Sequence, residues 1–188
     1  MNNAISSACL PKTYTYDVEG QRVSVVLQGN PFAYEPQTLY SLAARRNQKR
    51  GFLFVSKVLG KHIPVDPFVP LLAGINLGAY FIDSIHKVNH VDVQAVVQAL
   101  KTKEHTQEVY ERVMAKPSFV LPQETLFIGF AETATGLGHA VFSLFANAHY
   151  LHTTREIIPL LPPVLNFNEV HSRAVNHLCY LENSELLK

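Results

Sequence analysis

The sequence predicts an α/β fold with a mostly parallel central sheet flanked by helices. Two short apolar runs, residues 51–55 (GFLFV) and 125–131 (TLFIGFA), have the composition of strands covered on both faces. A third, less apolar run at 149–153 is the next candidate strand. Helix-like segments lie around these runs, and alternation of the two kinds of element is typical of parallel sheets. The expected helices are residues 67–79, 91–101, 104–115 and 138–147.

The segments on either side of this core follow other patterns. Alternating Tyr, Thr and Val around Glu19-Gly20 predict an N-terminal hairpin with strands near 13–18 and 22–28. Residues 37–46 are expected to form a helix, because their apolar residues fall on one face. Residues 157–164 (IIPLLPPV) contain three prolines, which a central strand does not accommodate, so we expect the chain to leave the sheet there.

The composition indicates a single globular domain over residues 1–188. Hydrophobic residues make up 47% and charged residues 16%, with a formal net charge of +1. Because the net charge is small, it creates no overall field that would attract nucleic acid or an anionic membrane, and neither is expected as a partner. The apolar stretch 65–85 contains prolines and aspartates, which makes it a poor membrane span. Two distant cysteines without a CxxC pattern, and an N-terminus without a signal-peptide pattern, predict a cytoplasmic location.

The segment AETATGLG, residues 131–138, has the composition of a turn that binds phosphate. It follows a candidate strand, and a helix is expected to begin near Gly138. Glycines let the backbone approach a ligand, and the N–H groups at a helix start attract anions. The hydroxyls of Thr133 and Thr135 add neutral donors. The carboxyl end of a strand in an α/β sheet is also where ligands usually bind.

Two other interpretations of this segment stay open. One is an ordinary strand-to-helix connection in which Thr135 is the N-cap and the glycines only make the bend. The other is the dinucleotide-binding turn of a Rossmann-type, NAD(P)-binding oxidoreductase. Residues 136–140 (GLGHA) form a partial GxGxx(G/A) motif, and Glu156 follows about twenty residues later. Val141 stands in the last position of that motif, where Gly or Ala is usual.

A second segment with anion-binding character follows the earlier candidate strand. Residues 56–64 (SKVLGKHIP) place Lys57, Lys61 and His62 around Gly60. A pyrophosphate carries several negative charges, so loop amides and lysine ammonium groups are its expected partners. The alternative is a surface loop whose lysines are only solvated.

Residues 130–136 (FAETATG) resemble the loop of type I phosphoribosyltransferases that binds 5-phosphoribosyl 1-diphosphate (PRPP). In that family a strand ends in one or two acids, followed by a short turn such as (A/T)TG and a helix. The resemblance implies that Glu132 faces the ribose hydroxyls, although Ala131 stands where a second acid is usual. It also implies contacts with the 5′-phosphate from Thr133, Ala134, Thr135, Gly136, Leu137 and Gly138.

The order of the two segments also resembles that family, which places a pyrophosphate loop after its first core strand. The resemblance implies PRPP contacts from Ser56 and Gly60, and catalytic roles for Lys57 and Lys61 together with Glu132. It implies Mg²⁺ as the cofactor, carried by PRPP and held largely by its phosphates. No protein-held transition metal is expected, because the histidines lack the spacing of a zinc site.

Further motifs narrow the resemblance to one group. RNQKRGFLFVSKVLGKHIPVDP, AETATGLGHAVF, HTTRE and FNEVHSRAVNHL together resemble the phosphoribosyltransferases of bacterial tellurium-resistance (Ter-type) gene clusters, over roughly residues 14–180. Relatives often carry a further C-terminal domain, so the chain is either a fragment or a short member. The resemblance implies a type I phosphoribosyltransferase-like core at about 37–156. A small hood at about 157–188 is expected to join the hairpin 13–28.

The implied activity is transfer of the 5-phosphoribosyl group of PRPP to a nucleobase-like nitrogen acceptor, with release of pyrophosphate. A non-catalytic module that binds PRPP or a nucleotide is the alternative. Neither the acceptor base nor the oligomeric state follows from the sequence; a homodimer is one option. Candidate base-binding residues in or near the hood are Arg155, Glu156, Phe167, Glu169 and His171. For the first two the alternative is a surface ion pair, and for the others a capped helix start.

Overall fold

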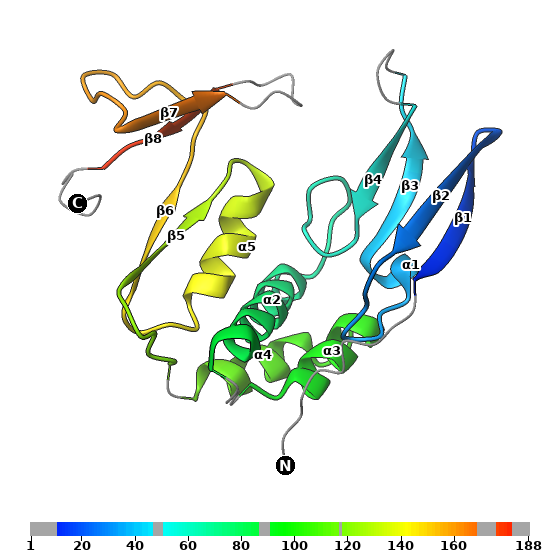
Figure 1. The fold of residues 1–188 in the computed structure, drawn as a ribbon, viewed down its shortest axis with the longest axis horizontal. Helices are drawn as coiled ribbons and strands as arrows, with labels where there is room; N and C mark the ends of the chain where they lie inside the picture. Colours follow the sequence, from blue (N-terminus) through cyan, green and yellow to red (C-terminus); the bar gives the residue numbers. More distant parts are fainter. Residues whose placement is uncertain (1–10, 47–50, 87–90, 117, 169–175, 182–188) are drawn as a thin grey trace. The chain divides into compact units, whose positions relative to one another are not determined.

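The computed structural model describes residues 11–46, 51–86, 91–116, 118–168 and 176–181. The chain divides into two compact units, Met1–Lys116 and Pro117–Lys188, and each is described by itself (Figure 1). The architecture is mixed α/β, and the described strands form four two-stranded sheets. One of these sheets is parallel, which agrees with the predicted class. A larger parallel sheet is not seen in the part of the chain that the structure describes.

The first unit opens with the predicted hairpin. Strand β1 (Lys12–Val18) pairs antiparallel with β2 (Gln21–Leu27). Glu19 and Gly20 between them both have positive φ, at 49° and 81°, as a tight hairpin turn requires. The Asp17 carboxylate accepts a hydrogen bond from the Gly20 N–H at 3.0 Å and closes the turn. Turn chemistry therefore determines this hairpin, and the prediction is confirmed.

The helix predicted at 37–46 is wrong. Helix α1 is confined to Pro36–Leu39, and strand β3 (Tyr40–Ala44) follows it directly. Strand β3 pairs antiparallel with β4 (Phe52–Ser56), so the strand predicted at 51–55 exists but does not lie in a parallel sheet. The ring of Tyr40 meets that of Phe54 at 4.9 Å, and Phe54 is 48% exposed. Cross-strand aromatic contacts on a half-exposed ribbon explain the apolar run, and burial on both faces does not.

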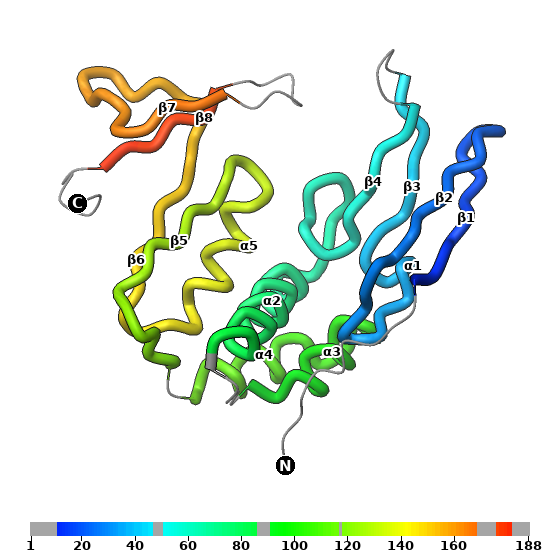
Figure 2. The backbone as a smooth tube through the Cα atoms, viewed as in Figure 1, coloured from blue at the N-terminus to red at the C-terminus, as the bar shows by residue number. Residues whose placement is uncertain are grey.

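Three helices complete the first unit: α2 (Phe68–His86), α3 (Val93–Thr102) and α4 (Thr106–Met114). They match the helices predicted at 67–79, 91–101 and 104–115. In Figure 2, α2 lies next to α3 and α4. The stretch Phe68–Ile85 of α2 is long and apolar enough to cross a membrane by length and composition, but 44% of it is buried within this structure. Leu72, Ile75 and Ile82 are fully buried, as expected of a core helix.

The second unit is built on a β-α-β motif. Strand β5 (Thr125–Gly129), helix α5 (Thr133–Phe142) and strand β6 (Ala148–His152) follow one another, and the two strands are parallel. Figure 1 shows α5 lying alongside the strand pair. Its buried residues Ala140 and Val141 belong to the core that Leu144, Phe145 and Leu151 complete. The helix begins at Thr133, so the start predicted near Gly138 is wrong.

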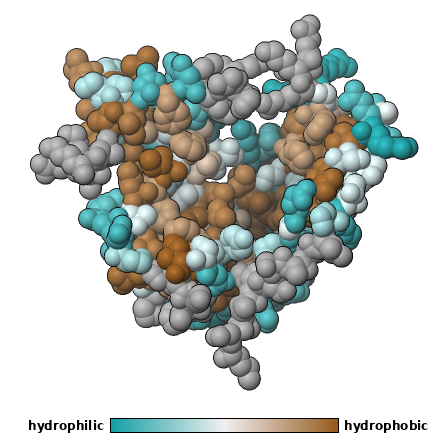
Figure 3. All heavy atoms as spheres, in the orientation of Figure 1, coloured by the Kyte–Doolittle hydropathy of each residue, from teal (hydrophilic) through white to brown (hydrophobic). Residues whose placement is uncertain are grey.

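Residues 157–164 contain no helix or strand, as the prolines predict. Figure 3 shows apolar residues gathered on the visible face where this segment leads into β7. Strands β7 (Leu165–Asn168) and β8 (Asn176–Cys179) then form an antiparallel pair. Thr154 and Leu178 exchange two backbone hydrogen bonds of 2.8 Å, which attach β8 to the chain that continues from β6. The single-domain arrangement with a core and a hood stays a prediction.

Candidate functional site

The connection from β5 to α5 is short and closely packed. A Cβ atom at Gly129 would collide with the Tyr150 hydroxyl and would lie 2.9 Å from the Ala134 carbonyl oxygen. A Cβ atom at Gly138 would lie 3.1 Å from the Tyr150 ring and 3.3 Å from the Gly129 Cα. Glycine is therefore needed for the close approach of α5 to the strands. Gly136 and Gly138, the two glycines of the predicted turn, lie inside α5, so the prediction that they form a turn before the helix is wrong.

Gly136 serves a different purpose. It is exposed, and a Cβ atom at this position would meet nothing within 4 Å. Its backbone therefore faces open space near the N-terminus of a ten-residue helix. N–H groups and the helix dipole favour an anion at such a place. This is the position where a phosphate group can approach the main chain.

The residues that precede and open α5 have defined partners. Glu132 is the N-cap residue, and its side chain makes no capping hydrogen bond. The Thr135 hydroxyl donates to the Glu132 carbonyl oxygen at 2.7 Å, and the Thr135 carbonyl accepts from the Tyr150 hydroxyl. The interpretation of Thr135 as the N-cap is therefore wrong, since it lies within the first helical turn. The Glu132 carboxylate makes no helix cap and is exposed, as a ligand contact requires.

The same geometry bears on the dinucleotide-binding alternative. That fingerprint needs its first two glycines at the turn where the strand ends and the helix starts. Here β5 ends at Gly129, and Gly136 is the fourth residue of α5. The glycine spacing of residues 136–140 is thus displaced into the helix, and the arrangement does not meet the requirement of a dinucleotide site.

The carboxyl end of β6 contacts the residues that leave β5. The Thr153 N–H donates to the Gly129 carbonyl oxygen at 2.9 Å, and the Ala131 N–H donates to the Thr153 hydroxyl at 2.7 Å. Arg155 Nη2 lies 3.5 Å from the Ala131 carbonyl oxygen, and its buried Nε has no hydrogen-bond partner. The peptide bond between Ala131 and Glu132 is cis. The structure therefore places Arg155 beside the predicted phosphate-binding residues, and it forms no ion pair with the exposed Glu156.

An aromatic cluster adjoins this end of the sheet. The rings of Phe167 and His177 are stacked at 5.1 Å with an interplanar angle of 7°. Phe130 meets both rings edge-on, at 5.6 Å and 5.9 Å. Phe130 is 50% exposed and Phe167 39% exposed, so part of the cluster is open to a planar ligand. The other two hood candidates, Glu169 and His171, lie outside the described residues.

The second predicted segment follows β4 in the first unit, in a stretch without helix or strand. Gly60 has a φ of +67°, which glycine adopts readily and other residues do not. The Ser56 hydroxyl accepts a hydrogen bond from the Val58 N–H at 3.2 Å, and Lys57 Nζ donates to the Gln37 carbonyl oxygen at 2.9 Å. Lys61 is exposed. The loop is turned by its own local hydrogen bonds, and it presents lysine side chains and backbone N–H groups.

Comparison with known proteins identifies the family. A family model described as phosphoribosyl transferase matches residues 39–188, most of the chain. The chain belongs to the phosphoribosyl transferase family. The matched region contains both the segment after β4 and the residues from β5 to α5. No match is found among curated proteins or among solved structures.

Three residues of this phosphoribosyl transferase were missed by sequence reasoning. Burial, and to a smaller extent the charge of Lys57, lower the pKa of Lys103. Phe130 and His177 join the aromatic cluster. The only sequence signal for Phe130 is its place directly before Ala131-Glu132. His177 and Lys103 carry no such signal, because only the fold brings them near these segments.

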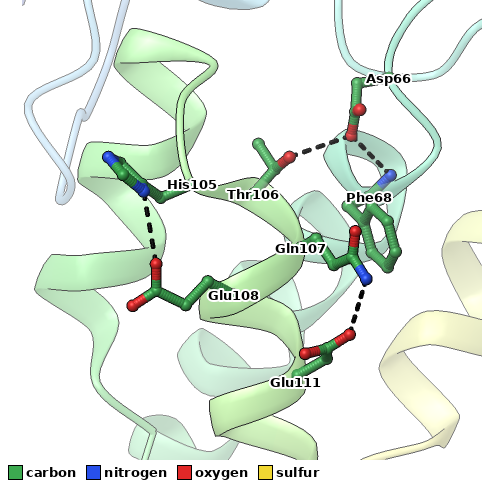
Figure 4. Close-up of a pocket in the computed structure, with 7 residues that line it drawn as sticks. All are labelled: Asp66, Phe68, His105, Thr106, Gln107, Glu108 and Glu111. Atoms are coloured by element: carbon green, nitrogen blue, oxygen red, sulfur yellow. Dashed lines mark hydrogen bonds and ion pairs between the residues drawn. The ribbon is translucent and has the colours of Figure 1, made fainter.

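A shallow pocket of about 430 Å³ in the first unit does not fit a phosphoribosyl ligand (Figure 4). Asp66 accepts hydrogen bonds there from the Thr106 hydroxyl at 3.0 Å and the Phe68 N–H at 2.9 Å. Its carboxylate therefore joins the starts of α2 and α4. Carboxylates in such a lining repel a phosphate. The lining residues are Asp66, Phe68, His105, Thr106, Gln107, Glu108 and Glu111.

Proposed function

We propose that this member of the phosphoribosyl transferase family transfers the 5-phosphoribosyl group of PRPP to a nitrogen atom of a nucleobase-like acceptor and releases pyrophosphate. One observation carries the proposal. The N-terminus of α5 lies at the carboxyl end of β5, with an open backbone at Gly136 and the Arg155 side chain beside the preceding residues. Such a place suits a phosphate monoester, because helix N–H groups and a guanidinium both bind phosphate oxygens.

The residues of this connection would position the ribose. The helix N–H groups between Thr133 and Gly138 would bind the 5′-phosphate, and Glu132 would accept hydrogen bonds from the ribose hydroxyls. Departure of pyrophosphate gives the ribose C1 oxocarbenium character, while negative charge grows on the leaving group. Catalysis then depends on alignment and on neutralising that charge, which we assign to Lys57 and Lys61.

Magnesium enters the proposal with PRPP. Among the described residues, no group of three or more His, Cys, Asp and Glu side chains is arranged to hold a metal ion. We propose an ion bound mainly by ligand phosphate oxygens, with the exposed Glu132 as a candidate carboxylate. When bound, Mg²⁺ would supply positive charge at the pyrophosphate.

The aromatic cluster favours a planar acceptor. The exposed parts of Phe130 and Phe167 could stack on a heterocyclic base close to the proposed ribose site. The narrower assignment to the Ter-type group rests on the motifs quoted above, and we propose it on that ground. A cytoplasmic location and a homodimer belong to the same proposal.

Calorimetry with PRPP–Mg²⁺, NAD and NADP tests the ligand class. We expect PRPP–Mg²⁺ to bind, and tight NAD binding without PRPP binding would overturn the proposal. The exposed Lys61 offers a sharper test. Lys61→Ala should weaken PRPP and pyrophosphate binding about ten- to a hundredfold and leave ribose 5-phosphate binding unchanged, since one charge-assisted contact contributes roughly 1.5–3 kcal/mol. The matched control is Lys101→Ala on the exposed face of α3, which should alter none of the three affinities.

A non-catalytic PRPP-binding module is the second candidate. It is favoured by Ala131, which stands beside Glu132 where a second acid would give an additional ribose and metal contact. Release of pyrophosphate from PRPP in the presence of a panel of nucleobases separates the two. Release that is abolished in Lys61→Ala excludes the binding module. PRPP binding with no release in the panel favours the module over the transferase.

A further inference from the structure

A buried hydrogen-bonded chain connects β8 to the residues that open α5. Thr153 is 1% exposed and His177 is 3% exposed. The Thr153 hydroxyl lies 2.9 Å from His177 Nδ1 and accepts the Ala131 N–H at 2.7 Å. The Phe130–Ala131 peptide group is thus held by a side chain of β8, through the residue that follows β6.

The proton positions follow from the donors and acceptors. A threonine hydroxyl has one proton to give, and its two lone pairs can accept. Here one lone pair accepts the Ala131 N–H, and the hydroxyl proton is available to His177 Nδ1. In the tautomer that accepts this proton, the ring proton of His177 is on Nε2. In the opposite arrangement the buried Thr153 hydroxyl proton would need a further acceptor.

His177 is fixed by its own surroundings. Its ring is stacked on Phe167, its partner across the β7–β8 ladder, and touches the edge of Phe130. The following residue, Leu178, exchanges two backbone hydrogen bonds with Thr154. His177 therefore contacts Phe130 directly and Ala131 through Thr153, so it determines how the chain leaves β5.

We propose that His177, acting through Thr153, is a positioning residue for the ligand-binding residues at the start of α5. It holds the Ala131 N–H while Arg155 lies at the Ala131 carbonyl group, so that the next residue, Glu132, and the helix N–H groups face the ribose phosphate. This inference rests on the proposed function, in which those groups bind PRPP. Neither residue touches the ligand, so their effect is confined to the ribose 5-phosphate end of PRPP.

Four variants of the full chain test the proposal. Thr153→Val keeps the shape and removes the hydroxyl, whereas Thr153→Ser keeps the hydroxyl. His177→Phe keeps the stacked ring and removes Nδ1, whereas His177→Asn keeps an acceptor near that position. His152→Phe is the matched control: this exposed histidine immediately precedes Thr153, and its Nδ1 lies 3.2 Å from the Thr153 carbonyl oxygen, not from the hydroxyl that bonds Ala131 and His177.

The first readout needs no ligand. We expect amide hydrogen exchange of residues 131–136 to become about tenfold faster in Thr153→Val, since a buried N–H is left without its partner. Thr153→Ser and His152→Phe should retain wild-type exchange. His177→Phe loses Nδ1 and His177→Asn loses the stacked ring, so both should fall between wild type and Thr153→Val. Nitrogen NMR of wild-type His177 should show an unprotonated Nδ1. Wild-type exchange in both Thr153→Val and His177→Phe, or a protonated Nδ1, overturns the proposal.

The second readout compares two ligands. Thr153→Val should bind ribose 5-phosphate about tenfold more weakly and pyrophosphate as well as wild type. Equal losses for both ligands in Thr153→Val, with a matching loss in Thr153→Ser, would indicate general destabilisation and overturn the positioning role. If the wild type binds neither PRPP nor ribose 5-phosphate, the proposed function fails. The exchange experiment then decides alone whether His177 and Thr153 hold the connection.

Discussion

Replacing Gly136 by alanine separates the stability of α5 from its proposed role in binding. Gly136 lies in the first turns of the helix, its φ is not positive, and a Cβ atom there would meet nothing within 4 Å. Glycine inside a helix costs about 0.5–1 kcal/mol relative to alanine. We therefore expect Gly136→Ala to raise the free energy of unfolding by about that amount. For a chain of this length the change corresponds to an increase of about 1–4 °C in Tm.

The same substitution should weaken ligand binding. If a phosphate lies against the Gly136 backbone, the added methyl group occupies part of its place. Overpacking of this kind costs about 1–3 kcal/mol. We expect the affinities for PRPP and ribose 5-phosphate to fall about tenfold, which corresponds to about 1.4 kcal/mol. Pyrophosphate affinity should not change, because its proposed segment is elsewhere in the chain.

Thermal unfolding and calorimetric titration of the same preparations give both numbers. Gly129→Ala is the contrasting control, because its Cβ atom would collide with Tyr150 and the Ala134 carbonyl group. It should lower the free energy of unfolding by about 1–3 kcal/mol. A lower Tm for Gly136→Ala would refute the helical assignment of this residue. A higher Tm with unchanged PRPP affinity would refute the phosphate position.

Three further outcomes are expected. Asp92→Ala should lower the free energy of unfolding by about 1 kcal/mol in urea titration, since its carboxylate caps α3 at the Ala95 N–H (3.1 Å). Burial, with a smaller contribution from the hydrogen bond to Tyr16, raises the pKa of Tyr40 from 10.0 to about 12. The protonated Tyr40 phenol therefore contributes its full stabilisation below pH 10, and this contribution is lost between about pH 10 and 12. Urea midpoints should therefore fall less steeply over this range in Tyr40→Phe. Since burial and the charge of Lys57 lower the pKa of Lys103, Lys57→Ala should raise that pKa in an NMR titration, and an unchanged value would contradict their proximity.

The fold could be predicted from the sequence where local chemistry determines it. The hairpin turn at Glu19-Gly20 and the proline-rich segment 157–164 were predicted because glycine and proline restrict the backbone directly. Strand β3 was not predicted, because the apolar spacing of residues 37–46 over one short window fits a helix and a strand equally well. Only the aromatic contacts of β4 with β3 decide between the two, and these depend on residues distant in sequence.

The proposed site shows the same division. The proposed phosphate-binding role of residues 131–138 rests on the pattern of a strand followed by a helix, and the nearness of Arg155 to Ala131 follows from a β-α-β unit, in which the carboxyl ends of parallel strands meet. The helix start was placed too late, because Gly136 and Gly138 were interpreted as turn residues, whereas both lie inside α5 and Gly138 packs against Tyr150. Thr153 and His177 could not be found, since a buried hydrogen bond between β8 and the chain after β6 leaves no periodic pattern in the sequence.

The two segments proposed to bind PRPP belong to different compact units. Ser56, Gly60 and Lys61 lie in the first unit, and residues 133–138 lie in the second. PRPP carries a 5′-phosphate and a pyrophosphate, and the half-ligands ribose 5-phosphate and pyrophosphate each carry one of these groups. A ligand stabilises whatever it binds in proportion to its occupancy. Pyrophosphate should therefore slow amide exchange in the first unit and ribose 5-phosphate in the second, because the two proposed segments lie in different units. Slower exchange in the opposite unit with either half-ligand would contradict the assignment of the two segments.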